Sequence, residues 1–258
     1  MNVTENEILG YLAGFIWPFF RISSMFITIP VFSVNALPAR VRVIASLLIT
    51  LAIFPTLPAM PTIDVFGYQG LLVAVQQVAL GATAGFILQM VFSIMLFAGQ
   101  AIAYSMGLGF ASMVDPVSGV QVPVVAQLFV ISGSLLFLAV DGHLLLIEML
   151  AQSFHTLPIA ATGIGKADLW RVALWGGTIF ADGLLLAMPV MAALLFVNIS
   201  FGVASKAAPQ LQIFGVGFPV TIMLGMVLIW VGLPTLLEVF ADMLHQGFAL
   251  VNELLRLQ

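Results

Sequence analysis

The sequence contains no cysteine and very few charged residues. Of its 258 residues, 7 are Lys or Arg and 11 are Asp or Glu, so that only 7% carry a charge. The absence of cysteine excludes disulfide bonds, thiolate catalysis and Cys-ligated zinc or iron–sulfur sites. A soluble domain usually has about 25% charged residues, and so few charges cannot give a chain of this length a polar surface. The composition therefore excludes an ordinary water-soluble fold.

Positive charge is especially scarce. The formal net charge is −4, and no cluster of Lys and Arg is present to neutralise phosphates, so no nucleic-acid partner is predicted. Hydrophobic residues make up 62% of the chain, and the mean hydropathy is +1.19. Disorder is excluded as well, because a chain this apolar has ample surface to bury. The remaining class is an integral membrane protein in contact with lipid.

Long stretches without charge dominate what is present. The longest covers residues 65–114, between Asp64 and Asp115, and an apolar helix needs roughly 20 residues to cross a bilayer. The pattern predicts an all-α protein of the membrane type, with a single domain over residues 1–258. Six segments are expected, and several exceed one bilayer span, so kinks or hairpins are expected within them. Their approximate ranges are 8–35, 41–60, 70–104, 123–156, 168–205 and 210–250.

Two further signals bear on insertion. The stretch Met1–Glu7 is acidic, whereas a cleaved signal peptide begins with a basic region, so none is predicted. The Lys and Arg residues that follow the first segment are split three against three between the two expected sides of the membrane. The charge bias that normally sets orientation therefore leaves it undecided.

Polar residues recur along the fourth segment at intervals of seven. They are Gln127, Ser134, Asp141, Glu148 and His155, with Gln152 four residues after Glu148. In one continuous helix they share a face, and lipid is an unsuitable environment for such a face. Two interpretations stay open. The stripe either makes polar contacts between helices of the chain, or it faces a water-filled passage or partner subunits.

Arg21 interrupts the first apolar segment, directly after Trp17-Pro18-Phe19-Phe20. One interpretation is an arginine that snorkels to the membrane interface beside a belt of aromatic residues. The other is a buried contact with a carboxylate or a helix C-terminus of a partner. Ionisable groups at membrane depth are costly and usually functional, and nothing in the sequence decides between the two.

The third segment carries small residues and amides. Gly81 and Gly85 form a GxxxG step, which permits close approach of two helices. Gln76 and Gln77 precede it, and buried amides of this kind need partners, which we expect on neighbouring helices.

The connection between the third and fourth segments is unusual for a loop. It reads Ser105-Met106-Gly107-Leu108-Gly109-Phe110-Ala111-Ser112-Met113-Val114-Asp115-Pro116-Val117-Ser118-Gly119. A solvated loop is normally polar, whereas this one combines glycines, whose backbone is permissive, with methionines, which fill irregular gaps. It suits a deformable seal. A re-entrant turn buried in protein is the alternative.

Motifs for catalysis and metal binding are absent. The chain has no HExxH, GxSxG or P-loop pattern. Asp141, His143, Glu148 and His155 carry possible ligand atoms, but His143 points about 160° away from Asp141 in a regular helix. We therefore predict no metal, no cofactor and no enzymatic activity.

Several local strings follow one another along essentially the whole chain. They are Trp17-Pro18-Phe19-Phe20-Arg21, Pro38-Ala39-Arg40-Val41-Arg42, Gln76-Gln77 with Gly81, Gly107-Leu108-Gly109-Phe110-Ala111 through Asp115-Pro116, Asp141-Gly142-His143-Leu144, Ser153-Phe154-His155-Thr156-Leu157-Pro158-Ile159 and Ala208-Pro209-Gln210-Leu211-Gln212-Ile213-Phe214-Gly215-Val216-Gly217-Phe218-Pro219. In this order and with these spacings, the strings resemble the FliR/SctT family of type III secretion export-gate proteins, and its flagellar branch more than the injectisome branch.

The resemblance implies a fold like a fusion of FliP-like and FliQ-like helical hairpins. It implies a single copy in a gate with FliP and FliQ, contacts with FlhB and FlhA, and passage of unfolded flagellar proteins across the bacterial inner membrane at the basal body. It also implies that about residues 106–121 form a plug in the channel. The plug residues would be Met106, Gly107, Leu108, Gly109, Phe110, Met113, Asp115, Pro116 and Gly119. Packing or partner contacts would involve Arg21, Gln76, Gln77, Gly81, Gly85, Pro209 and Gln210. A stand-alone secondary transporter or channel, or the equivalent injectisome subunit, is the alternative.

Overall fold

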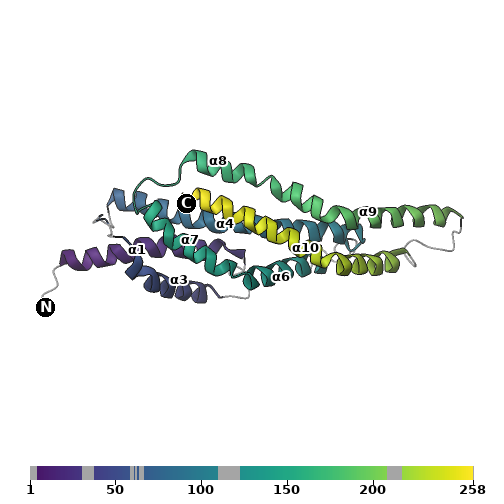
Figure 1. Cartoon of the computed structure of the whole chain (residues 1–258), viewed down its shortest axis with the longest axis horizontal. Helices are drawn as coiled ribbons and strands as arrows, with labels where there is room; N and C mark the ends of the chain where they lie inside the picture. Colours follow the sequence, from purple (N-terminus) through teal and green to yellow (C-terminus); the bar gives the residue numbers. More distant parts are fainter. Residues whose placement is uncertain are drawn as a thin grey trace. The chain divides into compact units, whose positions relative to one another are not determined.

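Every regular element in the described part of the chain is helical. The computed structural model describes residues 5–30, 38–58, 61, 63, 67–109, 123–207 and 217–257. Its elements are α1 (Glu5–Thr28), α3 (Ala39–Ile53), the short 3-10 helix η1 (Phe54–Thr56), α4 (Tyr68–Ser105), α6 (Val124–Ala139), α7 (Gly142–Thr156), α8 (Lys166–Trp175), α9 (Thr178–Ala207) and α10 (Phe218–Leu254) (Figure 1). The expected all-α class is confirmed.

Four helical stretches within the described residues are long and apolar enough to cross a membrane. They are Ala39–Thr56, Tyr68–Ser105, Lys166–Lys206 and Phe218–Leu254. The pair α6 and α7 adds a fifth if the interrupted pair is counted as one span. The lengths agree with the roughly 20 residues that a bilayer requires, so the membrane-type composition has its counterpart in the helices.

Two of the six predicted segments are interrupted, in agreement with the expectation of kinks or hairpins within them. The segment expected over 123–156 breaks between α6 and α7, where Asp141 has φ 55° in the left-handed region. That conformation cannot continue a right-handed helix. The segment expected over 168–205 breaks at Gly176 and Gly177, between α8 and α9, where glycine has the weakest helix propensity after proline.

The chain divides into two compact units, each built from separate stretches of sequence. Unit 1 contains Met1–Met90, Val140–Gly176 and Leu244–Gln258, and unit 2 contains Val91–Ala139 and Gly177–Met243. Helices α4 and α10 contribute residues to both units. The prediction of one domain over residues 1–258 stays a prediction.

Unit 1 depends on a close approach of α1 to α4. A Cβ placed on Gly81 would lie 1.9 Å from the carbonyl oxygen of Arg21, and one placed on Gly85 would lie 2.0 Å from Oγ1 of Thr28. Only glycine leaves space for this contact. Beside it, a buried cluster from α1, α4, α7 and the stretch after α7 fills the interior: Trp17, Val73, Phe154 and Ile159.

Helix α3 packs along α1 with its polar side inward. Its buried residues are Ser46 and Thr50, whose hydroxyls donate to the carbonyl oxygens of Arg42 and Ser46 at 2.7 and 2.6 Å. Because these hydroxyls are satisfied within the helix, their burial leaves no orphaned donor. The aliphatic side chains of α3, among them Leu48, face outward.

Unit 2 has an aromatic core. The ring of Phe92 meets those of Phe137 and Phe240 edge-on, with centroids 5.7 and 5.4 Å apart, a favoured geometry for aromatic pairs. Gly133 lies beneath the Phe240 ring, where a Cβ would be 3.1 Å from two ring atoms. Helices α4, α6 and α10 therefore meet around this triad.

Candidate functional site: a buried arginine and outward apolar faces

Arg21 on α1 is the centre of a polar cluster inside unit 1. Its side chain is completely buried. Nε donates to Oε1 of Gln77 on α4 at 2.8 Å, one terminal nitrogen donates to Oγ of Ser153 on α7 at 2.9 Å, and the other donates to the carbonyl oxygen of Leu157 at 2.9 Å. One guanidinium thus links three helical elements.

The hydrogen-bond acceptors around Arg21 are all uncharged. Leu157 is the residue that follows the last turn of α7, so its carbonyl lies at the negative end of the helix dipole. The guanidinium carbon also lies 4.2 Å from the centre of the Phe154 ring, a cation–π contact whose strength increases on desolvation. A helix end, two polar side chains and an aromatic face together replace the water that the cation has lost.

This geometry decides between the two interpretations of Arg21. The snorkelling interpretation is wrong, because no part of the side chain reaches the surface. The contact with a helix C-terminus does occur, but the helix belongs to the same chain. Ser153 and Phe154 were not singled out as partners from the sequence, since only their place on the inward side of α7 brings them to Arg21.

Gln76, next to Gln77, has a separate structural task. Its Oε1 accepts a hydrogen bond from the backbone N–H of Ile164 at 3.2 Å. The bond ties α4 to the segment that connects α7 to α8. The two adjacent glutamines therefore stabilise two different contacts of unit 1.

The first residues of the predicted plug are anchored within unit 2. Met106 is buried, and its carbonyl oxygen accepts a hydrogen bond from Oγ1 of Thr221 on α10 at 3.3 Å. Gly107 has φ +85°, and a Cβ there would lie 2.5 Å from the ring of Phe218. The N–H of Leu108 bonds back to the carbonyl of Ala103 at 3.0 Å.

Other members of the predicted sites lie outside the described residues. They are Phe110, Met113, Asp115, Pro116 and Gly119 of the plug, together with Pro209 and Gln210. Of the plug, the structure describes Met106, Gly107, Leu108 and Gly109. In Gly109, a Cβ would lie 2.7 Å from the Tyr104 ring.

The polar stripe does not form one continuous face, because the left-handed residue Asp141 interrupts the helix. Gln127 and Ser134 belong to unit 2, and the hydroxyl of Ser134 donates to the carbonyl of Val130 at 2.8 Å. The residues from 141 onward belong to unit 1. There Glu148, Gln152 and His155 are exposed on α7, and Nε2 of Gln152 donates to Oε1 of Glu148 at 3.1 Å.

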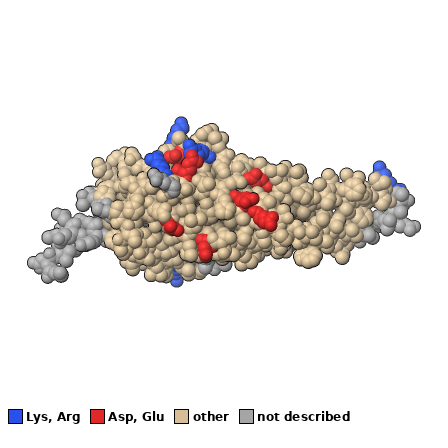
Figure 2. Space-filling view, in the orientation of Figure 1, with Lys and Arg blue, Asp and Glu red and all other residues tan. Residues whose placement is uncertain are grey.

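The outward surfaces of α9 and α10 are predominantly apolar. In the most apolar part of the stretch Lys166–Lys206, 11% of the residues are buried. Phe196 on α9 and Trp230 on α10 are 74% and 76% exposed. Carboxylates interrupt these surfaces, with Asp182 half-buried on α9, and Glu238 and Asp242 exposed on α10. Figure 2 shows how little of the visible face is charged.

Charge gathers mainly near α8. Figure 2 shows acidic and basic groups together over this helix. Arg171 of α8 forms an ion pair with Glu253 near the end of α10, and both side chains are more than half exposed. Within the described residues, no group of three or more His, Asp or Glu is placed to hold a metal ion.

Comparison with known proteins matches residues 12–247 to the family described as bacterial export proteins, family 1. Three similar proteins carry the name flagellar biosynthetic protein FliR. That of Pectobacterium carotovorum subsp. carotovorum is 38% identical, with 96% of this chain and 95% of the relative covered. That of Escherichia coli K12 is 36% identical, with 99% and 97% covered. That of Bacillus subtilis 168 is 26% identical, with 98% of each covered. The chain therefore belongs to the bacterial export proteins of family 1.

Proposed function

We propose that the chain is a pore-forming subunit of the bacterial flagellar type III protein export gate. The relatives named FliR support the flagellar system. The observation that carries the gate role is the mixed character of α9 and α10, which expose large aromatic and aliphatic side chains and also carry Asp182, Glu238 and Asp242. Lipid solvates apolar side chains but not carboxylates. Contact with other protein subunits accommodates both.

The partners in this proposal are FliP and FliQ in one hetero-oligomeric gate, with FlhB and FlhA in the same machinery. Unfolded flagellar subunits are the cargo, and the gate is placed in the inner membrane at the basal body. The chain contributes a wall of the channel and catalyses no reaction. The family resemblance and the helices long enough to span a membrane support this placement.

Co-purification tests the gate role. FliP and FliQ from the same bacterium are produced with the tagged chain, and the membranes are solubilised in mild detergent. The expected result is a stable complex of all three proteins, because each subunit covers apolar faces of the others. A stand-alone transporter would instead elute as a stable single species without FliP or FliQ, and that result would overturn the proposal.

The finer part of the proposal gives the segment that starts at Met106 the role of a plug. Its support is the anchored base: Met106 and Gly107 are held by Thr221 and Phe218, which gives a following apolar segment a firm attachment. Methionine and glycine make such a segment deformable. It would close the channel against ions and yield to an unfolded substrate.

Deletion of residues 110–119 tests the plug while leaving the anchor at Met106–Gly109 intact. The complete gate carrying this deletion is expected to leak ions, measured as loss of membrane potential in growing cells. Replacement of the same ten positions by a Gly/Ser segment of equal length controls for chain length. Wild-type membrane potential in the deletion variant, with the gate assembled at normal levels, would overturn the plug role.

A further inference from the structure

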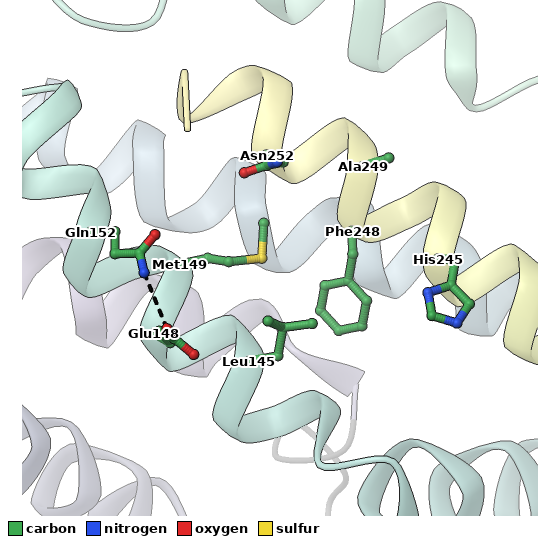
Figure 3. Close-up of a pocket in the computed structure, with 8 residues that line it drawn as sticks. All are labelled: Leu145, Glu148, Met149, Gln152, His245, Phe248, Ala249 and Asn252. Carbon is green, nitrogen blue, oxygen red and sulfur yellow. Dashed lines mark hydrogen bonds between the residues drawn. The ribbon is translucent and has the colours of Figure 1, made fainter. Parts of the chain in front are cut away.

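A groove in unit 1 separates α7 from the last turns of α10. Its volume is about 350 Å³, and Figure 3 shows the side chains that line it. The lining residues are Leu145, Glu148, Met149 and Gln152 of α7, with His245, Phe248, Ala249 and Asn252 of α10. Both walls are regular helix.

The floor of the groove is apolar and its rim is polar. Met149 and Phe248 are buried and extend from the two helices into the space between them (Figure 3). Glu148, Gln152 and His245 are exposed along the rim. A groove with this distribution offers an apolar anchor point together with groups that need polar partners.

Glu148 is the one charged residue of the lining. One of its oxygens accepts the hydrogen bond from Gln152, which leaves the other oxygen able to accept. Within the described residues, Glu148 forms no ion pair. The ion pair found in the described part of unit 1 joins Arg171 to Glu253. The carboxylate of Glu148 thus stands at the rim as a negative charge that is unpaired among the described residues, with one oxygen open to a further donor. The groove therefore complements a positive charge.

We propose that the groove binds an α-helix of another protein of the export machinery. The helix places a Lys or Arg side chain beside Glu148 and a large apolar side chain on Met149 and Phe248. The inference rests on the proposed function for the source of the helix, and on the lining of the groove for its chemistry. Many proteins bind an amphipathic helix in an apolar groove, and charged groups at the rim determine which helix binds.

The distribution of polar groups favours a protein helix over a lipid. His245 and Asn252 are seven residues apart on α10, which corresponds to about 10 Å along the helix. Glu148 and Gln152 lie one turn apart on the opposite wall. An acyl chain would offer no polar partner to His245, to Asn252 or to the second carboxylate oxygen of Glu148, whereas a helix with polar residues at intervals of three or four can offer one to each.

Site-specific photocrosslinking tests the occupant. A photoreactive residue replaces Ala249 in the full chain, within the assembled machinery in native membranes. The expected product is a crosslink to a helical peptide of another export protein with a Lys or Arg within one turn of the attachment point. Crosslinks to lipid alone, or back to this chain alone, would overturn the proposal. Leu144 is the matched control, because it is exposed on α7 and lies outside the groove.

A third photoreactive position separates this inference from the proposed function. Phe196 lies on the exposed face of α9 in unit 2. Protein crosslinks from position 196 with lipid crosslinks from position 249 would reject the groove as a docking site and leave the gate role intact. Lipid crosslinks from both positions would contradict both.

Charge reversal tests the role of Glu148. The Glu148→Lys variant is expected to lower recovery of the crosslinked partner at least about tenfold, and Glu148→Gln to lower it less, because the amide repels no cation. Reversal of the crosslinked Lys or Arg to Glu in the partner should restore recovery with Glu148→Lys. Lys166→Glu, at an exposed residue of α8, changes the net charge by the same two units in the opposite sense and controls for a general effect of charge reversal. Wild-type recovery with Glu148→Lys would overturn the assigned contact.

Discussion

The Nε of Arg21 donates a hydrogen bond to Oε1 of Gln77 at 2.8 Å, and this bond joins α1 to α4 inside unit 1. The cation is buried without a carboxylate among its hydrogen-bond partners. Uncharged acceptors, a helix end and the Phe154 ring solvate it instead. Removal of either member should therefore affect the stability of unit 1 more than any change at the surface.

Replacement of Arg21 by Met is expected to lower the free energy of unfolding by roughly 2–6 kcal/mol. The variant leaves Oε1 of Gln77 and the carbonyl of Leu157 buried without a donor, and each orphaned group costs about 1–3 kcal/mol. The double variant Arg21→Met/Gln77→Leu should recover part of the loss, because one orphan is removed. Denaturation in detergent measures both. A single variant as stable as the wild type would show that the cluster does not hold unit 1 together.

Substitution by alanine is expected to have opposite effects at two glycines, one at the contact between α1 and α4 and one on the open side of α9. Gly81→Ala brings a Cβ onto the carbonyl oxygen of Arg21 and should cost roughly 1–3 kcal/mol through overpacking. Gly202→Ala on α9 has open space around its Cβ, and should stabilise the helix by about 0.5–1 kcal/mol. Melting temperatures of the purified variants compare the two. Equal shifts of the same sign would contradict the close helix contact.

The outward face of α3 predicts a strong sensitivity to charge. Leu48 is 57% exposed and lies near the middle of the span Ala39–Thr56. Leu48→Lys should disfavour membrane insertion of this helix by about 3–4 kcal/mol. The fraction of protein that resists alkaline extraction from membranes measures the effect.

Thr50→Val is the control on the same helix. Thr50 is buried, and its hydroxyl bonds only to the carbonyl of Ser46 in the preceding turn among the described contacts. Its replacement by a side chain of similar shape should leave extraction nearly unchanged. If Thr50→Val released the protein and Leu48→Lys did not, the polar-inward orientation of α3 would be wrong.

The ion pair between Arg171 and Glu253 is expected to contribute little. Both side chains are more than half exposed, and exposed pairs typically stabilise by less than about 1 kcal/mol. Arg171→Ala should thus shift the melting temperature slightly, and the shift should vanish at about 1 M salt, where charges are screened over about 3 Å. A large shift that persists in salt would indicate a structural role for this pair.

The sequence predicted the class of helices better than their ends and breaks. Charge-free stretches long enough for a bilayer were visible directly, and the structure has long apolar helices in the corresponding places. The break at Asp141 leaves no mark in hydropathy, and its one signal in the sequence was the Asp141-Gly142 pair, a combination typical of turns. The polar stripe, which shares one face only in a continuous helix, is therefore divided between two units.

The partners of Arg21 show the same difference between what the sequence indicates and what only the structure shows. That a buried arginine needs unusual surroundings follows from its charge and the apolar residues beside it. That Ser153 and Leu157 supply its acceptors does not follow from the sequence, because they lie 132 and 136 residues away along the chain. The groove had a partial signal in Glu148 and Gln152, but its α10 wall became apparent only when the two helices were seen together (Figure 3).

By itself, the sequence determined that this protein is all-α, of the membrane type and a member of an export family. These properties follow from composition, from the lengths of charge-free runs and from ordered local motifs, all of which are local along the chain. The tertiary structure alone decided that Arg21 is buried among uncharged acceptors, that α3 packs its hydroxyls inward, and that Glu148 lines a groove. Those results depend on which helix faces meet, and helix packing joins residues far apart in sequence through space.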